Sequence, residues 1–526
     1  MQDIVLTMAT FIVYSGLLLA LAVSASRSMA GLRAKEYVDE FYTGGRGIGA
    51  FVVAMVLAAG LCSAGTFVGT PGLAYKNGLT WVVLTNWQNF MNLMVLGVLG
   101  KKIGIIARRI NARSFLDVFA ARYENNRTVI LLGGLSMLVF LIPYSTIQFV
   151  GGARMFEVMT GVNYYIGLLL MAVVVIIYTA FGGIRGATLA AAIQGAVMTV
   201  AAVLIFSFSV AKMGGLEAGM KIVQSIEPEL LTARAVGGIA TPRYLASFAV
   251  LFGLAILGMP HAITPALIYK NSRAMLRAVV IGAIAVTIWT VLMATTGTLA
   301  RVADPNLVVP DHATATMTMW GLPPVIGGIV LAGVTAAMQS TVAAMLILLS
   351  GSLLMDVYAK VIRPDASFEK ISSVTAPFTL GLGMVALLLA LSPPKALEWI
   401  VYFAVAGLES SFFVPLLAGL YWRRANVYGA IAGMVGGLGA YIIIAGYLKN
   451  LAFGMHPVVM SLFVSAVSYF VVTLATPPPS EKVLRLYWGK EPVLLDLPCA
   501  ACSNNIQLDQ PILRGLVCAR SINKKW

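Results

Sequence analysis

Charged side chains are scarce in this sequence, because Asp, Glu, Lys and Arg make up only 11% of its 526 residues. A typical soluble domain carries about 25%, so this chain has too little polar surface to cover several water-facing domains. Cysteine and histidine are scarce as well, with four and three residues, which tells against a disulfide scaffold or a histidine-rich metal site. The apolar segments hold no Ser-His-Asp, paired-carboxylate or phosphate-loop arrangement, so the sequence does not indicate an enzyme.

Apolar residues are abundant instead. They make up 59% of the chain, its mean hydropathy is +0.89, and a helix needs about 20 such residues to cross a membrane. The sequence therefore predicts an all-α polytopic membrane protein with about 13 transmembrane helices. The first apolar run follows Met1–Asp3, which carries no cation, so we interpret it as a retained span and not as a signal peptide. The predicted spans are Ile4–Ser24, Ile48–Tyr75, Thr80–Gly100, Thr128–Phe156, Asn163–Phe181, Ala187–Val210, Tyr244–Tyr269, Ala278–Leu299, Pro323–Leu354, Ile371–Leu391, Ala396–Trp422, Val427–Leu448 and Pro457–Ala475.

The basic residues are distributed unevenly between the two sides of these spans. The net charge is +15, and roughly three quarters of the 36 Lys and Arg residues fall in alternate connections and in the C-terminal segment. Cytoplasmic loops carry such an excess, so we expect the N-terminus outside and the C-terminus in the cytoplasm of a cell (plasma or inner) membrane. The charge is then a topology determinant, and it does not indicate a nucleic-acid partner. The expected partners are the lipid bilayer and small molecules, and the sequence does not identify a protein partner.

Two predicted spans are interrupted at corresponding places. The second contains Gly60, Gly65 and Pro71, and the seventh contains Gly258, Pro260 and Pro265. Each opens a possible unit of five helices, and because five is odd, the second unit enters the membrane from the opposite side. Paired interrupted helices indicate an inverted-repeat transporter with its site near the middle of the membrane. The alternative is that the glycines only allow close helix packing.

Adjacent hydroxyls occur in the ninth span, at Ser340 and Thr341. Hydroxyls in an apolar helix often bond to their own preceding turn, so this pair alone favours a structural role. Together with unwound carbonyls of a broken helix, however, it could supply several oxygen ligands to a small hard cation without any carboxylate.

Several stretches taken together resemble the sodium/solute symporter family. The similarity runs in order over roughly residues 5–475 and implies a five-plus-five inverted repeat (LeuT-like) with one leading and two trailing helices. The stretches that carry it are Phe41–Arg46, Pro71–Tyr75, Ile106–Arg109, Gln148–Arg154, Tyr178–Arg185, Gln194, Pro260–His261, Ala337 with Ser340 and Thr341, Gly407–Glu409 and Gly419–Trp422. The domains implied are a transmembrane domain at 1–476, with a leading helix at 4–24, a first repeat at 48–210, a second repeat at 244–422 and trailing helices at 427–475, and then a cytoplasmic tail at 477–526.

The resemblance also implies a sodium site and a co-transported sodium ion, with no organic cofactor. Its ligands would be backbone carbonyls of the first broken helix and oxygens of the ninth span. In this chain those positions are Ala59, Cys62, Ala337, Ser340 and Thr341. Carbonyl ligands tolerate most side chains, so the family's sodium site looks intact.

Three departures from the family pattern concern the second ion and the solute. Ala191 stands where the family normally has an Asp, and Ala343 and Ala344 stand at the hydroxyl positions of a second sodium site found in some members. A single sodium is therefore expected. Pro265 stands where an Arg usually follows the Pro-His pair, and such an Arg would be a natural partner for a carboxylate.

The candidate solute contacts are Ser63, Gln148, Pro260, His261 and Glu409. Glu409 is the clearest ionisable group inside a predicted span, and intramembrane carboxylates are functional candidates by default. For Glu409 the alternative is a structural carboxyl, and for His261 it is a packing residue. Cys499, Cys502 and Cys518 in the tail could bind metal or cycle redox, although a tail with inert thiols is the simpler interpretation.

Together with the resemblance, these observations predict a sodium-coupled secondary active symporter that imports a small organic solute by alternating access. The resemblance implies a pantothenate-like carboxylate as the first candidate. The alternatives are a proton-coupled member with Glu409 as carrier, a member that carries an amino acid or another monocarboxylate, and a transporter-like solute sensor. A sensor would need a signalling domain, and the tail is short for one.

Overall fold

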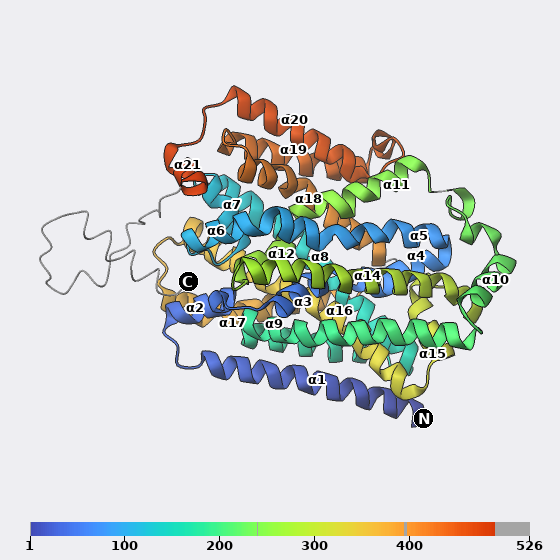
Figure 1. The fold of residues 1–526 in the computed structure, drawn as a ribbon. Coiled ribbons are helices and arrows are strands. Elements are labelled where there is room, and N and C mark those ends of the chain that lie inside the picture. Colours follow the sequence, from blue (N-terminus) through green and yellow to red (C-terminus); the bar gives the residue numbers. More distant parts are fainter. Residues whose placement is uncertain (1, 239, 394–396, 490–526) are drawn as a thin grey trace, which may run out of the picture.

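The structure, a computed structural model, describes residues 2–238, 240–393 and 397–489. Within these ranges the chain is helical, apart from loops and one isolated parallel bridge between Ile48 and Tyr269. The long helices lie side by side in one bundle (Figure 1). They are α1 (Gln2–Met29), α8 (Arg127–Thr160), α9 (Tyr164–Lys212), α14 (Ser272–Ala303), α16 (Pro324–Gly351), α17 (Phe368–Ala390), α18 (Leu397–Tyr421), α19 (Val427–Gly446) and α20 (Pro457–Ala475).

Shorter helices connect and complete the bundle. They are α2 (Ala34–Thr43), α3 (Ala50–Leu61), η2 (Gly65–Gly69), α4 (Thr70–Asn77), α5 (Leu79–Thr85), η3 (Asn86–Phe90), η4 (Leu93–Gly100), α6 (Lys101–Arg109), α7 (Phe115–Arg122), α10 (Leu216–Ile226), α11 (Pro242–Phe248), η7 (Ala249–Leu254), η8 (Ala255–Gly258), α12 (Pro260–Ile263), α13 (Pro265–Ile268), η9 (Pro310–His312), α15 (Ala313–Gly321), η10 (Ser352–Ile362) and α21 (Glu481–Trp488).

The described residues contain ten helical segments long and apolar enough to cross a membrane, or up to twelve if each of two bent helix pairs is one span. This confirms the prediction of an all-α polytopic membrane protein. The predicted count of 13 crossings stays a prediction. The predicted start of the eleventh span, Ala396, lies outside the described residues.

Helix α9 accounts for two of the predicted spans. At about 1.5 Å per residue, a straight helix of its 49 residues would be roughly 74 Å long, more than twice the hydrocarbon thickness of about 30 Å. Gly183 interrupts it with φ 55° and ψ −157°, a conformation that glycine adopts without steric cost. The amide Nε2 of Gln194 then donates to the hydroxyl of Tyr178 at 3.3 Å, although the two residues are 16 apart in sequence. The chain therefore reverses at Gly183, and the two arms of α9 are antiparallel.

Both interrupted spans are bent by nearly the same angle, as the glycine and proline pattern predicts. The first, Ala50–Leu61 with Gly65–Asn77, bends by 63°, and the second, Pro242–Gly258 with Pro260–Ile268, bends by 62°. Cys62 and Met259 are extended at the two breaks, with ψ of 103° and 112°. At Met259 the cause is local, because the residue before a proline is pushed out of the helical conformation.

The two broken helices run in opposite directions. Ile48, just before α3, donates its N–H to Ile268 O at 3.3 Å, and its carbonyl accepts from Lys270 N at 2.9 Å. The start of the first broken helix thus lies beside the end of the second. This is the relation that an inverted repeat requires.

Helix α21 lies within the segment expected to be a cytoplasmic tail. Its buried residues Val483 and Tyr487 are four apart and face the bundle. Arg109 at the end of α6 donates to Leu486 O at 2.8 Å and to Gly489 O at 3.0 Å. The tail cysteines 499, 502 and 518 lie outside the described residues.

Candidate functional site

The break in α3 frees a backbone carbonyl at the centre of the bundle. Helix α3 ends at Leu61, and its last backbone bond runs from Cys62 N to Ala58 O at 2.8 Å. Among the described backbone hydrogen bonds, none uses Ala59 O as an acceptor outside the helix. The lone pairs of this carbonyl are therefore available to side chains or to a cation.

Two hydroxyls of α16 converge on that carbonyl. Ser340 Oγ donates to Ala59 O at 2.8 Å and Thr341 Oγ1 donates to it at 3.2 Å. The same hydroxyls also reach Ala337 O, at 3.0 and 2.9 Å. Ser340 and Thr341 are buried, at 4% and 0% exposure. Four oxygens from two facing elements thus lie within hydrogen-bond distance of one another.

This arrangement suits a small hard cation. Each hydroxyl can turn its hydrogen away and offer a lone pair beside the two carbonyls, and unwound carbonyls with helix hydroxyls are the usual ligands of a coupling cation in such folds. Within the described residues no group of three or more His, Cys, Asp or Glu side chains could hold a metal. The four oxygens at this site belong to hydroxyl and carbonyl groups, so a cation held between them would be bound by neutral oxygens.

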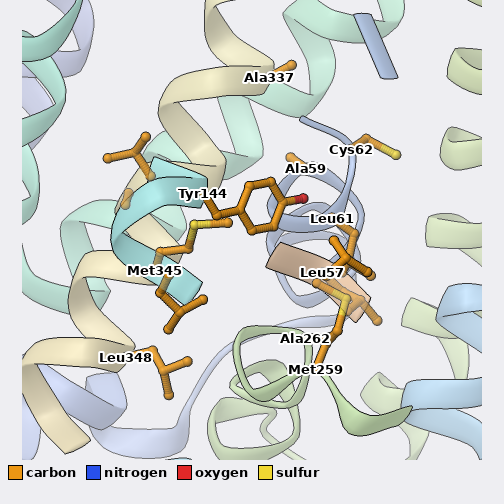
Figure 2. Close-up of a cluster of buried hydrophobic side chains, with 14 of the residues drawn as sticks. Leu57, Ala59, Leu61, Cys62, Tyr144, Met259, Ala262, Ala337, Met345 and Leu348 are labelled. Carbon is orange, nitrogen blue, oxygen red and sulfur yellow. The ribbon is translucent and has the colours of Figure 1, made fainter. Parts of the chain in front are cut away.

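Cys62 lies on the same break but does not take part in these hydrogen bonds. Figure 2 shows Ala59 and Cys62 on the broken segment, with Ala337 on the neighbouring α16. The structure thus brings together Ala59, Ala337, Ser340 and Thr341 as predicted from the sequence. A role for the carbonyl of Cys62 stays a prediction.

The positions of the family's second sodium site carry no ligand atoms in their side chains. Ala191 and Ala343 are buried at 5% and 2% exposure, and the methyl group of Ala344 faces Gly60. Close by along the same helices, an uncharged network ties α1 to α9 and α16: Tyr14 donates to Gln339 Oε1 at 3.0 Å, and Gln194 Nε2 donates to Tyr14 at 3.4 Å.

A small cavity of about 20 Å³ lies between the two breaks. Ser63 from the first break and Met259 from the second both line it, and none of the described residues that line it is charged. Its polar groups are Ser63, Thr66, Gln88, Tyr144 and Tyr402, and its apolar groups are Leu61, Met91, Phe252, Ile256, Val401 and Val405. The lining is thus apolar with a few hydroxyl and amide groups, the composition usual for sites of small organic solutes, although in this conformation the cavity is smaller than such a solute.

Tyr144 stands between the cavity and the cation site. Its hydroxyl donates to Ser63 Oγ at 3.4 Å, and in Figure 2 its ring lies between α16, which carries Met345, and the segment with Ala59 and Leu61. The residues of the two sites are four apart on one break, at Ala59 and Ser63. A solute in the cavity and a cation beside α16 would therefore contact the same broken segment.

Three of the predicted solute contacts, Gln148, Pro260 and His261, lie at or beside the two helix breaks in this conformation and do not line the cavity. Gln148 is fully buried, its Oε1 accepts from Ala64 N at 2.7 Å, and its Nε2 donates to Tyr144 O at 3.3 Å. Pro260 begins α12. His261 packs edge-on against Tyr144 with 5.8 Å between ring centroids, and neither ring nitrogen has a hydrogen-bond partner among the described residues. Of the five candidates, only Ser63 lines the cavity.

Glu409 is fully buried in α18, and neither carboxylate oxygen has a hydrogen-bond partner among the described residues. It lies one helical turn beyond Val405, which lines the cavity, and residues four apart share a helix face. An isolated ionised carboxylate is costly to bury. None of the described residues neutralises the Glu409 carboxylate, so the group that does so has to be a proton, an ion or a solute.

The sequence analysis did not single out most of the cavity wall. Gln88, Tyr144, Phe252 and Tyr402 line it. Tyr144 follows Pro143 and Phe252 precedes Gly253, but one such neighbour within a helix does not show that a side chain faces a cavity. Only the fold brings them together.

Two breaks, a neutral oxygen site and an adjoining small cavity within a helical bundle define a secondary transporter of the inverted-repeat class. A family model described as the sodium:solute symporter family matches residues 41–437. The chain belongs to this family and is a multi-pass membrane protein that couples sodium to the movement of a small solute.

The curated relatives are transporters and not enzymes. The chain is 38% identical to the sodium/pantothenate symporter of Escherichia coli (strain K12) over 451 residues, which cover 85% of this chain and 93% of the relative. It is 36% identical to the sodium/pantothenate symporter of Haemophilus influenzae, over 83% of this chain and 90% of the relative. The osmoregulated proline transporter of Bacillus subtilis is 26% identical over 87% and 93% of the two chains.

Solved structures support the fold. A Na+-coupled sialic acid symporter in its substrate-bound outward-open state superposes with a TM-score of 0.76 at 18% identity, over 90% of this chain and 98% of the other. A nucleobase-cation-symport-1 family transporter in a closed conformation gives 0.53 at 14% identity, over 85% and 97%.

Proposed function

We propose that this symporter imports a pantothenate-like carboxylate together with sodium bound by Ala59 O, Ala337 O, Ser340 Oγ and Thr341 Oγ1. The observation that carries the sodium site is the convergence of both hydroxyls on the freed carbonyl of Ala59, at 2.8 and 3.2 Å. The solute class is supported by the 36–38% identity to the sodium/pantothenate symporters.

The cavity offers a carboxylate no cationic side chain among its described lining residues, and Pro265 replaces the arginine expected from the family. The second half of the first broken helix, which begins near Ala64 and Gly65, provides another positive group. Gly65 lines the cavity, and the N-terminus of a half-helix carries a partial positive charge that favours an anion. A bound sodium at the same break would add a full charge.

The orientation that we propose has the N-terminus outside and the C-terminus in the cytoplasm of the inner or plasma membrane. Figure 1 shows the N-terminus of α1 at the opposite end of the bundle from α2, α6 and α21, where many Lys and Arg residues gather. In cells with the native thiols blocked, an impermeant maleimide should label Lys221→Cys but not Lys35→Cys; the reverse pattern would invert the topology.

Uptake into proteoliposomes tests the function. Radiolabelled pantothenate should accumulate when an inward sodium gradient is imposed, and unlabelled pantothenate should compete far better than proline. Accumulation should not occur when sodium is replaced by potassium under the same membrane potential. Sodium-driven uptake of proline without pantothenate transport would refute the solute while leaving sodium coupling intact.

A proton-coupled mechanism is the second candidate, because Glu409 is buried without a described partner. We expect Glu409→Gln to fold normally, since it keeps the shape of the side chain, and to lower the rate of uptake at low solute concentration about tenfold or more. A lost hydrogen bond to a charged group is worth about 1.5–3 kcal/mol.

The exposed Glu369→Gln at the start of α17 is the matched control. Wild-type uptake driven by a proton gradient alone, and abolished by Glu409→Gln, would establish the proton-coupled alternative. Unchanged transport per molecule in Glu409→Gln would make this carboxyl structural.

A further inference from the structure

A groove opens at the surface where α6, the end of α18 and α21 meet. It shares no lining residue with the cavity between the two helix breaks. Its volume is about 480 Å³, within the range of about 300–1,000 Å³ typical of ligand sites. We name it the α6–α21 groove. The side chains that define it are Lys101, Lys102, Arg109, Tyr421, Tyr487 and Trp488.

The cations of the α6–α21 groove have no carboxylate partner. None of the described residues lining it is acidic. Lys102 donates to Leu420 O and lies over the rings of Tyr421 and Trp488, at 5.0 and 4.4 Å from their centroids. Arg109 bonds only backbone carbonyls of α21, and the exposed Lys101 forms no ion pair within the described part of the chain. The positive charge of the groove is therefore left for an external anion.

A fourth cation, Arg122, lies beside the groove and adds to its positive charge. Arg122 is buried at 2% exposure, donates to Gly419 O at 2.6 Å and to Trp422 O at 3.1 Å, and lies over the Trp488 ring at 5.2 Å. Carbonyl dipoles and ring faces stabilise these cations without cancelling their charge.

The groove lies at the level where lipid headgroups are expected. The span Leu79–Arg109 has 31 residues, or roughly 46 Å at about 1.5 Å per residue, against a hydrocarbon layer of about 30 Å. Its last turns, which carry Lys101 and Arg109, therefore extend beyond the hydrocarbon. Val98 and Ile105, which also line the groove, are 37% and 42% exposed and give an acyl chain an apolar wall.

We propose that the α6–α21 groove binds the phosphate of an anionic phospholipid, with Lys101 and Lys102 contacting the headgroup, Trp488 and Tyr421 at the membrane interface, and an acyl chain along Val98 and Ile105. Basic pockets beside membrane helices favour anionic lipids in this way, and aromatic side chains concentrate at the same level. The bound lipid would hold α21 against α6.

The test compares short-chain lipids on the purified full-length protein in neutral detergent. Thermal stability is measured during titration with dioctanoyl phosphatidylglycerol, dioctanoyl phosphatidylcholine or inorganic phosphate. We expect phosphatidylglycerol to raise Tm at a lower concentration than the other two. The Lys101→Gln/Lys102→Gln variant should need about 30-fold more of it, since each lysine near an anionic surface contributes about 1 kcal/mol and tenfold corresponds to about 1.4 kcal/mol.

Lys35→Gln/Lys482→Gln is the matched control. It removes two exposed lysines from α2 and α21 that do not line the groove, and it should bind as the wild type does. The single Lys101→Gln variant, at an exposed site, replaces the double variant if that does not fold. Equal responses to both lipids, an equal response to inorganic phosphate, or an unchanged midpoint in the lysine variant would each overturn the proposal. A response that appears only when the chain is cut after Gly489 would assign the groove to segment 490–526 and would overturn it too.

Discussion

Replacing Ser340 and Thr341 together by alanine is expected to raise the sodium concentration for half-maximal uptake at least a hundredfold. Both hydroxyls converge on Ala59 O and Ala337 O, so the double variant leaves two carbonyls where four oxygens stood. Hydrogen bonds and contacts to a charged group are worth about 1.5–3 kcal/mol each. Losing two of them gives about 3 kcal/mol at the lower limit, which exceeds a factor of one hundred if they add.

Thr335→Ala is the matched control on the same helix. Thr335 is buried, and its hydroxyl donates only to Leu331 O and Ala332 O of its own turn. Both variants remove buried hydroxyls from α16, but only Ser340 and Thr341 reach the α3 break. Thr335→Ala should therefore keep the wild-type sodium dependence.

A binding measurement separates loss of the ion site from damage to the fold. At a sodium concentration 100 times its Kd, binding stabilises the folded state by about 2.7 kcal/mol, which should appear as a higher Tm in sodium than in potassium. The double variant should lose this difference while keeping the Tm in potassium close to that of Thr335→Ala. A wild-type sodium dependence in the double variant would remove these residues from the site.

The positions of the two helix breaks could be predicted from the sequence because glycine and proline act locally. Gly60, Gly65 and Pro260 disfavour a continuous helix wherever they stand, so the two breaks could be placed before any tertiary contact was known. In the inverted-repeat fold, the two broken helices run in opposite directions and α16 lies beside the break at Ala59. The bridge between Ile48 and Tyr269 places the start of the first broken helix beside the end of the second.

The roles of single polar residues could not be predicted in the same way. Gln148 looked like a solute contact because a buried amide needs partners, but its partner in the structure is the N–H of Ala64, which the break leaves unpaired. A broken helix creates both orphan carbonyls and orphan N–H groups, and the sequence does not say which side chain satisfies which. The sequence did not indicate that Tyr144 and Tyr402 line the cavity. The sequence pattern of an aromatic residue in an apolar helix is the same whether its side chain faces lipid, the protein core or a cavity.

Helix α21 was missed for a related reason. Its buried residues Val483 and Tyr487 form only one turn of apolar spacing, too short to stand out from a polar segment that follows three prolines. Its position depends on Arg109 and the other cations of the α6–α21 groove. These cations lie far from α21 in the sequence.

One sodium ion is expected to move with each solute molecule. Ala191, Ala343 and Ala344 offer only methyl groups where the family's second site has a carboxylate and two hydroxyls, and Ala191 and Ala343 are buried at 5% and 2% exposure. The network that joins Tyr14, Gln194 and Gln339 is uncharged. The described side chains at these positions and in this network therefore offer no negative charge that would favour a second cation.

The ion count limits how far the solute can accumulate. A charge crossing the membrane gains about 2.3 kcal/mol per 100 mV, and a tenfold sodium gradient adds about 1.4 kcal/mol. With a neutral solute, one sodium supplies about 3.7 kcal/mol, a limit of several hundredfold. With a monoanion, the charges cancel, and the limit falls to about tenfold from the sodium gradient alone.

Transport current recorded together with radiolabelled sodium and solute flux in proteoliposomes measures the ratio directly. We expect one sodium per solute, and for a monoanionic solute we expect no net current, because the two charges cancel. At the sodium concentration that half-saturates the wild type, the Ser340→Ala/Thr341→Ala variant should carry almost no coupled sodium flux, since no second site remains to carry it. A ratio of two, or sodium flux that survives in that variant, would contradict the single site and would mean that oxygens other than those at Ala191, Ala343 and Ala344 bind a second ion. Strong uphill uptake of a carboxylate would require such an ion, because tenfold is the most that one sodium can provide under this gradient.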